Sequence, residues 1–222
     1  TFVKNFFMSK ITKYLFLITL SVLTFSCKKS ENNSDLKVGN EIKHAKGLSI
    51  ITKENYSIVE VSTPWPNSKK KYSYILKKKN AVIPAEYKNH TQIQVPMKNI
   101  VLTSTTHIPS LEMLGEETKL VGFPNLNYIS SEKVRALIDA GKIKELGSNQ
   151  TLNTEVLIDL QPELIMGYGL DNSNPTLDNL EKNGLKVILN GDWNEQSPLG
   201  KVEWFKLFGV LFGKEKQAND IF

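Results

Sequence analysis

Cysteine and histidine are scarce in this 222-residue chain, which contains one cysteine and three histidines. One thiol cannot form an intrachain disulfide, and three scattered histidines do not supply the clustered ligands of a metal site. The sequence also lacks a serine in a G-x-S-x-G motif and a phosphate-binding P-loop. We therefore expect a protein that is not an enzyme and that holds no cofactor and no protein-ligated metal.

The formal charge of +5 overstates the basic character of the chain. Residues 1–27 contain three lysines and no acid, so the remainder holds 25 basic and 23 acidic residues, a net charge of +2. This balance gives no electrostatic basis for nucleic-acid binding, and no nucleic-acid partner is expected. Two lysine runs, residues 69–71 and 77–79, flank the run YSYI. They indicate a solvated hairpin face whose lysines protect an edge strand, with contact to acidic envelope surfaces as the alternative.

A single long apolar run, YLFLITLSVLTF, occupies residues 14–25 and follows three lysines. This order predicts a secretory signal peptide over residues 1–27, with Met8 as its start. The run is shorter than the roughly 20 residues of a membrane-spanning helix. Cys27, at the junction, resembles the lipidated cysteine of bacterial lipoproteins. We expect an exported protein anchored through Cys27, facing the periplasm or the outer face of the cytoplasmic membrane; the alternative is a free cysteine in a cleaved peptide.

Three kinds of sequence follow the signal peptide. Residues 28–46 are polar and without period, which indicates a flexible tether. Residues 47–95 contain short runs of alternating apolar and polar residues, which predict a small β-rich N-terminal extension of antiparallel strands. Between residues 96 and 213 strand and helix patterns alternate. The fold class predicted there is α/β, with a doubly wound, mainly parallel sheet.

The last residues, 214–222, begin another amphipathic helix. No glycine, proline or polar tail follows to end that helix. An incomplete amphipathic helix leaves its apolar face without a partner. We interpret the chain as a fragment truncated at its C-terminal side.

The loops after the predicted strands carry hydroxyl, amide and aromatic side chains. Ligands of parallel sheets bind beyond the carboxyl ends of the strands, and such a lining suits a bulky polar ligand held by stacking and neutral hydrogen bonds. The candidate ligand-binding residues are Ser104, Thr105, Thr106, His107, Phe123, Asn125, Asn149, Tyr168 and Trp193. For His107 a hydrogen-bonded position at a helix start is the alternative, and for Tyr168 and Trp193 it is packing at the sheet edge. Trp65, between two prolines, is interpreted as a turn anchor.

Four stretches in the second half of the chain carry a resemblance to a known family. They are NIVLTSTTHIPSLEMLGEETKLVGF, LGSNQTLNTEVLIDLQPELIMGYG, LDNLEKNGLKVIL and SPLGKVEWFKLFGVLFGKEKQA. The segment from residue 96 to residue 222 resembles the substrate-binding proteins of iron-siderophore and cobalamin ABC importers. This resemblance implies two α/β lobes joined by one long rigid helix, with the ligand in the cleft between them. Residues 96–213 match the first lobe and residues 214–222 the beginning of the inter-lobe helix, and the second lobe is missing.

The resemblance also implies partners and roles. It assigns Glu155, at the start of a helix, to docking on arginines of the ABC permease, where an acid of no consequence in the first helical turn is the alternative. It implies a monomeric, lipid-anchored receptor that captures an iron-siderophore, haem or cobalamin-type chelate, with the metal arriving inside its chelator. Two other classes stay open. One is a zinc or manganese receptor of related architecture, and the other is an envelope α/β enzyme using His107 and Asp192 as acid and base.

Overall fold

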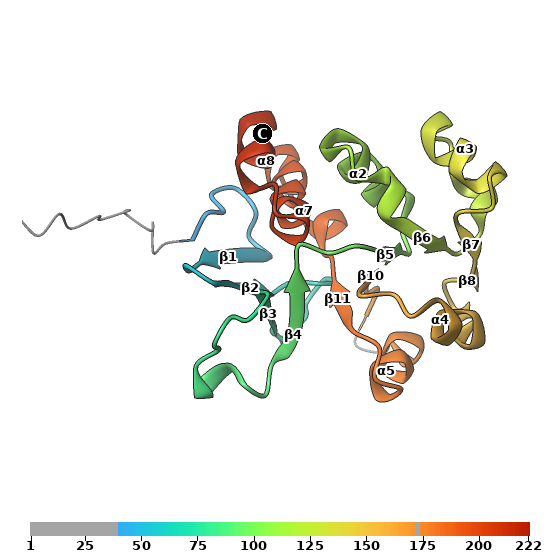
Figure 1. Ribbon diagram of the computed structural model, residues 1–222. Coiled ribbons are helices and arrows are strands. Elements are labelled where there is room, and N and C mark those ends of the chain that lie inside the picture. Colours follow the sequence, from blue (N-terminus) through green and yellow to red (C-terminus); the bar gives the residue numbers. More distant parts are fainter. Residues whose placement is uncertain (1–39, 172–173) are drawn as a thin grey trace, which may run out of the picture. The chain divides into compact units, whose positions relative to one another are not determined.

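The computed structural model describes residues 40–171 and 174–222, which form two main sheets and their helices (Figure 1). The predicted signal peptide, the lipidation of Cys27 and the tether up to residue 39 lie outside the described residues. Within the described ranges, none of the helices combines the length and the apolarity that crossing a bilayer requires.

The N-terminal extension is a four-stranded sheet with the order β1-β2-β3-β4. Its strands are β1 (Leu48–Thr52), β2 (Tyr56–Val61), β3 (Tyr72–Lys78) and β4 (Thr91–Val95). Strands β1, β2 and β3 pair antiparallel as predicted, but β3 and β4 pair in parallel. The loop between them, which contains the 3-10 helix η1 (Ala85–Tyr87), returns the chain to the starting end of β3. Strand β3 is therefore interior, and the prediction that its flanking lysines protect an edge strand is wrong.

The second sheet is entirely parallel and has the order β11-β10-β5-β6-β7. Its strands are β5 (Ile100–Leu102), β6 (Leu120–Phe123), β7 (Lys144–Glu145), β10 (Ile165–Gly167) and β11 (Val187–Leu189). The chain runs outward from β5 to β7 and then returns to place β10 on the other side of β5. The sheet is thus doubly wound, as predicted, and its topological switch point lies between β5 and β10.

Helices cover both faces of this parallel sheet (Figure 1). One core contains β5 residues Ile100 and Leu102 with side chains of α2 (Ile108–Leu114), α3 (Glu132–Asp139) and α7 (Phe205–Phe212). The other core contains Val101, between those two, with side chains of α4 (Thr154–Leu160) and α5 (Pro175–Lys182). Alternate residues of one strand point to opposite faces, so the apolar run IVL serves both cores.

Short elements complete the α/β part. They are η2 (Thr105–His107), η3 (Glu117–Lys119), η4 (Leu126–Tyr128), β8 (Gly147–Ser148), β9 (Thr151–Leu152), η5 (Asp192–Asn194), α6 (Pro198–Glu203) and α8 (Glu215–Ile221). The sequence from Ser197 to Gly213 has the pattern of one helix, but it forms two helices, α6 and α7, that meet at Trp204. Its buried indole nitrogen donates to Glu195 Oε1 at 3.1 Å, and the N–H of Leu207 donates to its carbonyl at 3.0 Å in a tightened turn.

Residues 40–47 are bound to the α/β part by two buried carboxylates. Glu203 accepts backbone hydrogen bonds of 2.6 to 3.0 Å from three successive residues, 43–45. Glu195 accepts further ones from the N–H groups of Lys46 and Gly47. The prediction of a flexible tether over residues 28–46 is therefore wrong for residues 40–46, because charge-assisted hydrogen bonds fix their backbone.

Candidate ligand-binding site

A hollow lies at the switch point of the parallel sheet, beyond the carboxyl ends of β5 and β10. It encloses about 220 Å³; most of its lining residues are polar, although apolar atoms supply the larger share of the lining surface. The lining residues are Thr103, Asn149, Gln150, Leu152, Tyr168, Leu170, Asp171, Asn174, Pro175, Thr176 and Leu177. Thr103 closes the inner end, where its hydroxyl donates to the carbonyl of Met166 at 3.3 Å. We call this the switch-point hollow.

Two predicted ligand residues meet in this hollow. The side-chain amide of Asn149 donates to the hydroxyl of Tyr168 at 3.2 Å, and both side chains are partly buried. Asn149 lies in the turn between β8 and β9, whose register is supported by the 2.8 Å hydrogen bond between the hydroxyls of Ser148 and Thr151. The neighbouring carbonyl of Gln150 accepts from Thr176 of α5 at 2.8 Å. These hydrogen bonds connect the β8–β9 turn with the loop after β10 and with α5.

Close packing explains why glycines stand on either side of Tyr168. A Cβ on Gly167 would lie 2.8 Å from Leu177 Cδ1, and a Cβ on Gly169 would overlap the ring of Trp65. Trp65, from the extension, is only 1% exposed and stacks edge-on against Tyr72 with 5.9 Å between ring centroids. It is a buried anchor beneath the loop, and the close approach of its indole requires glycine at position 169.

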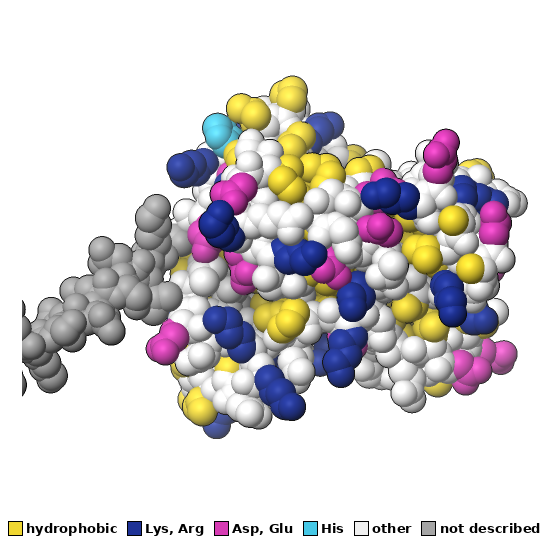
Figure 2. Space-filling model, turned by 45° about the horizontal axis from the view of Figure 1, so that its top comes forward, with side chains coloured by type: hydrophobic (Ala, Val, Ile, Leu, Met, Phe, Trp, Pro, Cys, Tyr) yellow, Lys and Arg dark blue, Asp and Glu magenta, His cyan; other side chains and the backbone are white. Residues whose placement is uncertain are grey.

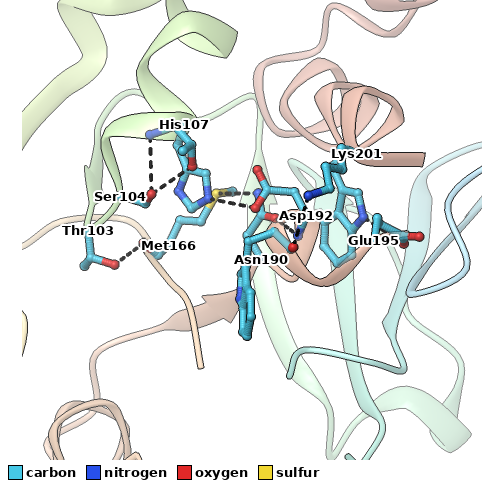
Figure 3. Close-up of polar contacts among 11 residues, drawn as sticks. Thr103, Ser104, His107, Met166, Asn190, Asp192, Glu195 and Lys201 are labelled. Carbon is cyan, nitrogen blue, oxygen red and sulfur yellow. Dashed lines mark hydrogen bonds and ion pairs between the residues drawn. The ribbon is translucent and has the colours of Figure 1, made fainter. Parts of the chain in front are cut away.

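A second hollow of about 420 Å³ lies between α2, η5 and α6 and has a more apolar lining. It is lined by Thr106, Ser110, Met113, Asn190, Asp192, Trp193, Lys201, Val202, Trp204, Phe205 and Phe208. Asn190 fixes the backbone at one side of this hollow, since its Oδ1 accepts a hydrogen bond from the N–H of Asp192 at 2.9 Å (Figure 3). Lys201 Nζ donates to the carbonyl of Trp193 at 3.4 Å. Thr106 and Trp193 thus lie apart from the pair formed by Asn149 and Tyr168.

His107 points toward Asp192, the pair that an acid–base mechanism would use (Figure 3). Their nearest atoms, Nε2 and Oδ1, are 3.9 Å apart, which is beyond hydrogen-bond distance. The imidazole is 1% exposed, packs against Phe208 with 6.0 Å between ring centroids, and makes no hydrogen bond within the described part of the chain. In residues 40–171 and 174–222, no three histidine, cysteine or acidic side chains group as a metal site would require.

Four other candidates occupy positions that differ from the expected lining. Phe123, at the end of β6, is 1% exposed. It belongs to the core that also contains side chains of α2 and α3. Asn125 adopts a left-handed backbone (φ 53°), and its N–H donates to Glu145 Oε1 at 2.9 Å. Ser104 caps η2 by accepting from the N–H of Thr106 at 3.3 Å, and Thr105 is exposed beside it.

Glu155 stands in the first turn of α4 and is exposed. The side chain of Asn153 caps the helix by accepting from the N–H of Val156 at 3.1 Å. No hydrogen bond or ion pair within the described residues engages the carboxylate of Glu155. That carboxylate is therefore free to meet a basic partner.

Thr103, Gln150 and Asn174 line the switch-point hollow but were not among the predicted residues. The signal for Thr103 was available, because a hydroxyl directly follows the buried run IVL. Asn174 and Gln150 carried no such signal, since their place depends on how α5 packs beside the β8–β9 turn.

Comparison with known proteins finds a family match in the second half of the chain. Residues 100–222 match the sequence profile of a family described as periplasmic binding protein. An uncharacterized lipoprotein of Methanocaldococcus jannaschii is 25% identical over 210 residues, which is 85% of this chain and 50% of the relative. The chain thus spans about half the length of the curated relatives it matches.

Two of the solved structures that the chain matches are a heme-binding protein and a siderophore-binding protein. A periplasmic heme-binding protein from Pseudomonas aeruginosa is 22% identical with a TM-score of 0.42, covering 56% of this chain and 41% of that chain. The triscatecholate siderophore-binding protein from Bacillus subtilis, solved with ferri-bacillibactin, is 20% identical with a TM-score of 0.42, covering 58% of this chain and 42% of that one.

Proposed function

Because this chain belongs to the periplasmic binding protein family, we propose that it is the substrate-binding protein of an ABC importer, which captures an iron-siderophore, haem or cobalamin-type chelate. The observation that carries the proposal is the switch-point hollow and its lining. Amides, hydroxyls and the Tyr168 ring can bind a large chelate by stacking and neutral hydrogen bonds. The metal then stays inside its chelator, and no protein ligand to it is needed.

Residues 96–213 are proposed to be the first lobe of the receptor, and α8 the beginning of a helix that leads to a second lobe. The support is the order of elements and the family match over residues 100–222. A hollow of about 220 Å³ is smaller than a typical small-molecule site, which encloses roughly 300–1,000 Å³. It suits one wall of a cleft that a second lobe would complete.

Delivery to the permease is proposed to use Glu155. Its carboxylate is exposed, lies in the first turn of α4 and has no partner within the described residues. Such a group can form charge-assisted hydrogen bonds to arginine without first breaking a bond inside the protein. Anchoring through a lipid on Cys27 completes the proposal, and the naming of a curated relative as a lipoprotein supports it.

The proposal is tested by equilibrium titration of the protein with a panel of separate probes. These are a ferric hydroxamate, a ferric catecholate, haem and cyanocobalamin, with zinc and manganese chlorides alongside. The expected result is saturable binding of one chelate class and none of the free ions. Binding of zinc or manganese alone would favour a metal receptor and contradict the proposal, and so would failure of all four chelates to bind.

A further inference from the structure

Charge is divided unequally between the two parts of the chain. Residues 47–95 carry eight basic and three acidic residues, a net charge of +5, whereas residues 96–222 carry 12 basic and 17 acidic ones, a net charge of −5. In the space-filling view, lysine and arginine side chains gather toward the lower left, where few acidic ones appear (Figure 2). Both hollows of the candidate site are lined by residues of the acidic part alone. A ligand therefore meets the negatively charged part of the protein.

Lysines precede three strands of the parallel sheet, at its amino-end edge. Lys119 directly precedes β6, Lys186 directly precedes β11, and Lys98 precedes β5 by two positions. Two acids follow strands instead, since Asp171 comes four positions after β10 and Asp192 three positions after β11. All five strands are parallel, so their starts share one edge and their ends the other. These lysines therefore lie across the sheet from the edge that holds both hollows.

Only one basic side chain lines the candidate site. Among the described residues, the switch-point hollow is lined by Asp171 and by no lysine, arginine or histidine, and the second hollow by Asp192 and Lys201. Two carboxylates and one ammonium give the combined lining a net charge of −1. The one arginine of the chain, Arg135, donates to a backbone carbonyl at 2.9 Å and lines neither hollow. Arginine is the side chain best suited to bind oxyanions, so this lining disfavours an anionic ligand.

The two hollows are close enough to act on one ligand. Thr103 lines the first and Asn190 the second, and both contact Met166 between them. The hydroxyl of Thr103 donates to the carbonyl of Met166 at 3.3 Å, and the amide of Asn190 donates to its sulfur at 3.6 Å (Figure 3). Thr103 follows β5 and Asn190 follows β11, and β10 alone separates those strands. At a strand spacing of about 4.8 Å the two positions are about 10 Å apart, which is within the span of one chelate.

The charge of Asp192 is accessible to a ligand and has no close cation beside it. Its side chain is 20% exposed, and its Oδ1 lies 3.9 Å from Nε2 of His107, beyond hydrogen-bond distance. No lysine or arginine forms an ion pair with Asp192 in residues 40–171 and 174–222. Charges interact more strongly where protein displaces water. An anionic group at this edge is therefore repelled, and a cationic one is attracted.

We propose that the site selects its chelate by charge, binding complexes of zero or positive net charge and excluding those of negative net charge. The inference rests on the proposed function and deepens it, because it names the class of chelate. Each hydroxamate carries one negative charge, so three of them neutralise iron(III), and a free amine makes the complex cationic. Catecholates carry two charges each and leave a strongly anionic complex, and haem carries two propionates. Ferric hydroxamates and neutral corrinoids are thus the expected ligands, whereas ferric catecholates and haem are excluded.

The test titrates the full chain with one chelate scaffold in three charge forms. A linear ferric trihydroxamate whose free end is an ammonium, an acetamide or a succinamate is cationic, neutral or anionic, with the same iron centre in each. Cyanocobalamin and its monocarboxylic acid form a second matched pair, and a ferric triscatecholate and haem serve as anionic probes. Quenching of intrinsic fluorescence at low ionic strength gives the affinities. The ammonium form is expected to bind about tenfold more tightly than the succinamate form, and added salt should reduce this ratio.

Variants of the two acids connect the selection to the lining. Asp171→Asn and Asp192→Asn keep the size of the side chain and should each lower the ratio by about threefold, and the double variant should remove it. Asp159→Asn is the matched control. Asp159 is exposed in the last turn of α4, which leads to the start of β10 at the other edge of the sheet, and it lines neither hollow. This control should retain the native ratio, and thermal unfolding checks that every variant is folded.

The outcomes separate this inference from the function on which it rests. Equal or tighter binding of the anionic form of either pair, or saturable binding of the triscatecholate or haem, would overturn charge selection and leave the receptor proposal standing. Charge selection is also overturned if the control lowers the ratio as much as the two lining variants do. Failure of every probe to bind would contradict the receptor proposal itself, and the inference with it.

Discussion

The side-chain amide of Asn149 donates a hydrogen bond of 3.2 Å to the hydroxyl of Tyr168 and so joins two loops across the switch point of the parallel sheet. The amide belongs to the β8–β9 turn and the phenol follows β10. The ring of Tyr168 is thereby oriented before any ligand arrives. Preorganisation of this kind lowers the entropic cost of binding.

Removal of the Tyr168 ring is expected to weaken chelate binding by about tenfold, since one stacking contact is lost. The change is Tyr168→Ala, and fluorescence titration with the chelate that the native protein binds measures it. Tyr128→Ala is the matched control, because Tyr128 is 73% exposed and lines neither hollow. Equal affinities of the two variants would exclude a role for Tyr168 in the site.

Gly169→Ala is expected to destabilise the protein by about 1–3 kcal/mol, because the added methyl group overlaps the buried Trp65 ring. Urea unfolding gives the free energy. Combining the change with Trp65→Phe, which frees space, should cost less than the sum of the two single changes. Strict additivity would mean that the two residues do not contact each other in this way.

Glu203→Gln is expected to lower the free energy of unfolding by about 2–4 kcal/mol, since three backbone N–H groups lose their charged acceptor. Burial alone would raise the pKa of Glu203, but hydrogen bonds from Ala45, Lys43 and His44, and one from Lys206, outweigh it and lower the pKa below 4.5. The stabilisation is therefore complete above pH 4.5 and is lost as pH falls through the depressed value. Chemical unfolding across the acid range should show this loss in the native protein and not in the variant.

Glu155→Gln is expected to reduce docking on the permease by at least about tenfold and to leave chelate affinity unchanged. Glu132→Gln is the control, since Glu132 is likewise an exposed acid in the first turn of a helix, α3. Binding to permease in nanodiscs measures both. If the two variants dock equally well, Glu155 is an ordinary first-turn acid.

Much of the α/β part could be predicted from local pattern. Buried runs such as IVL and VIL alternate with capped helices, and parallel strands with short connections follow from that order. The helix starts follow a known sequence preference, since Ser131, Asn153 and Ser197 are cap-forming residue types and each accepts a backbone hydrogen bond at a helix start.

The rest depended on contacts between distant segments. The parallel pairing of β3 with β4 follows from the path of the loop between them, which periodicity does not encode. Glu203 binds the backbone of Lys43, 160 residues away, and backbone donors leave no trace in a sequence. The predicted ligand-binding residues are distributed over two hollows for the same reason. Their positions after strands identified Tyr168 and Trp193 as candidates, but the packing of the helices places them in separate hollows.

The most direct test of the account is an amide NMR titration of the 25.1 kDa protein with a diamagnetic form of the chelate that binds, such as the gallium(III) form of a siderophore. Gallium replaces paramagnetic iron(III) and leaves the signals visible. The account predicts that the largest shifts cluster at Thr103, Asn149, Tyr168 and their neighbours around the switch-point hollow. Shifts confined to other surfaces, or none at saturation, would contradict the claim that this hollow binds the chelate.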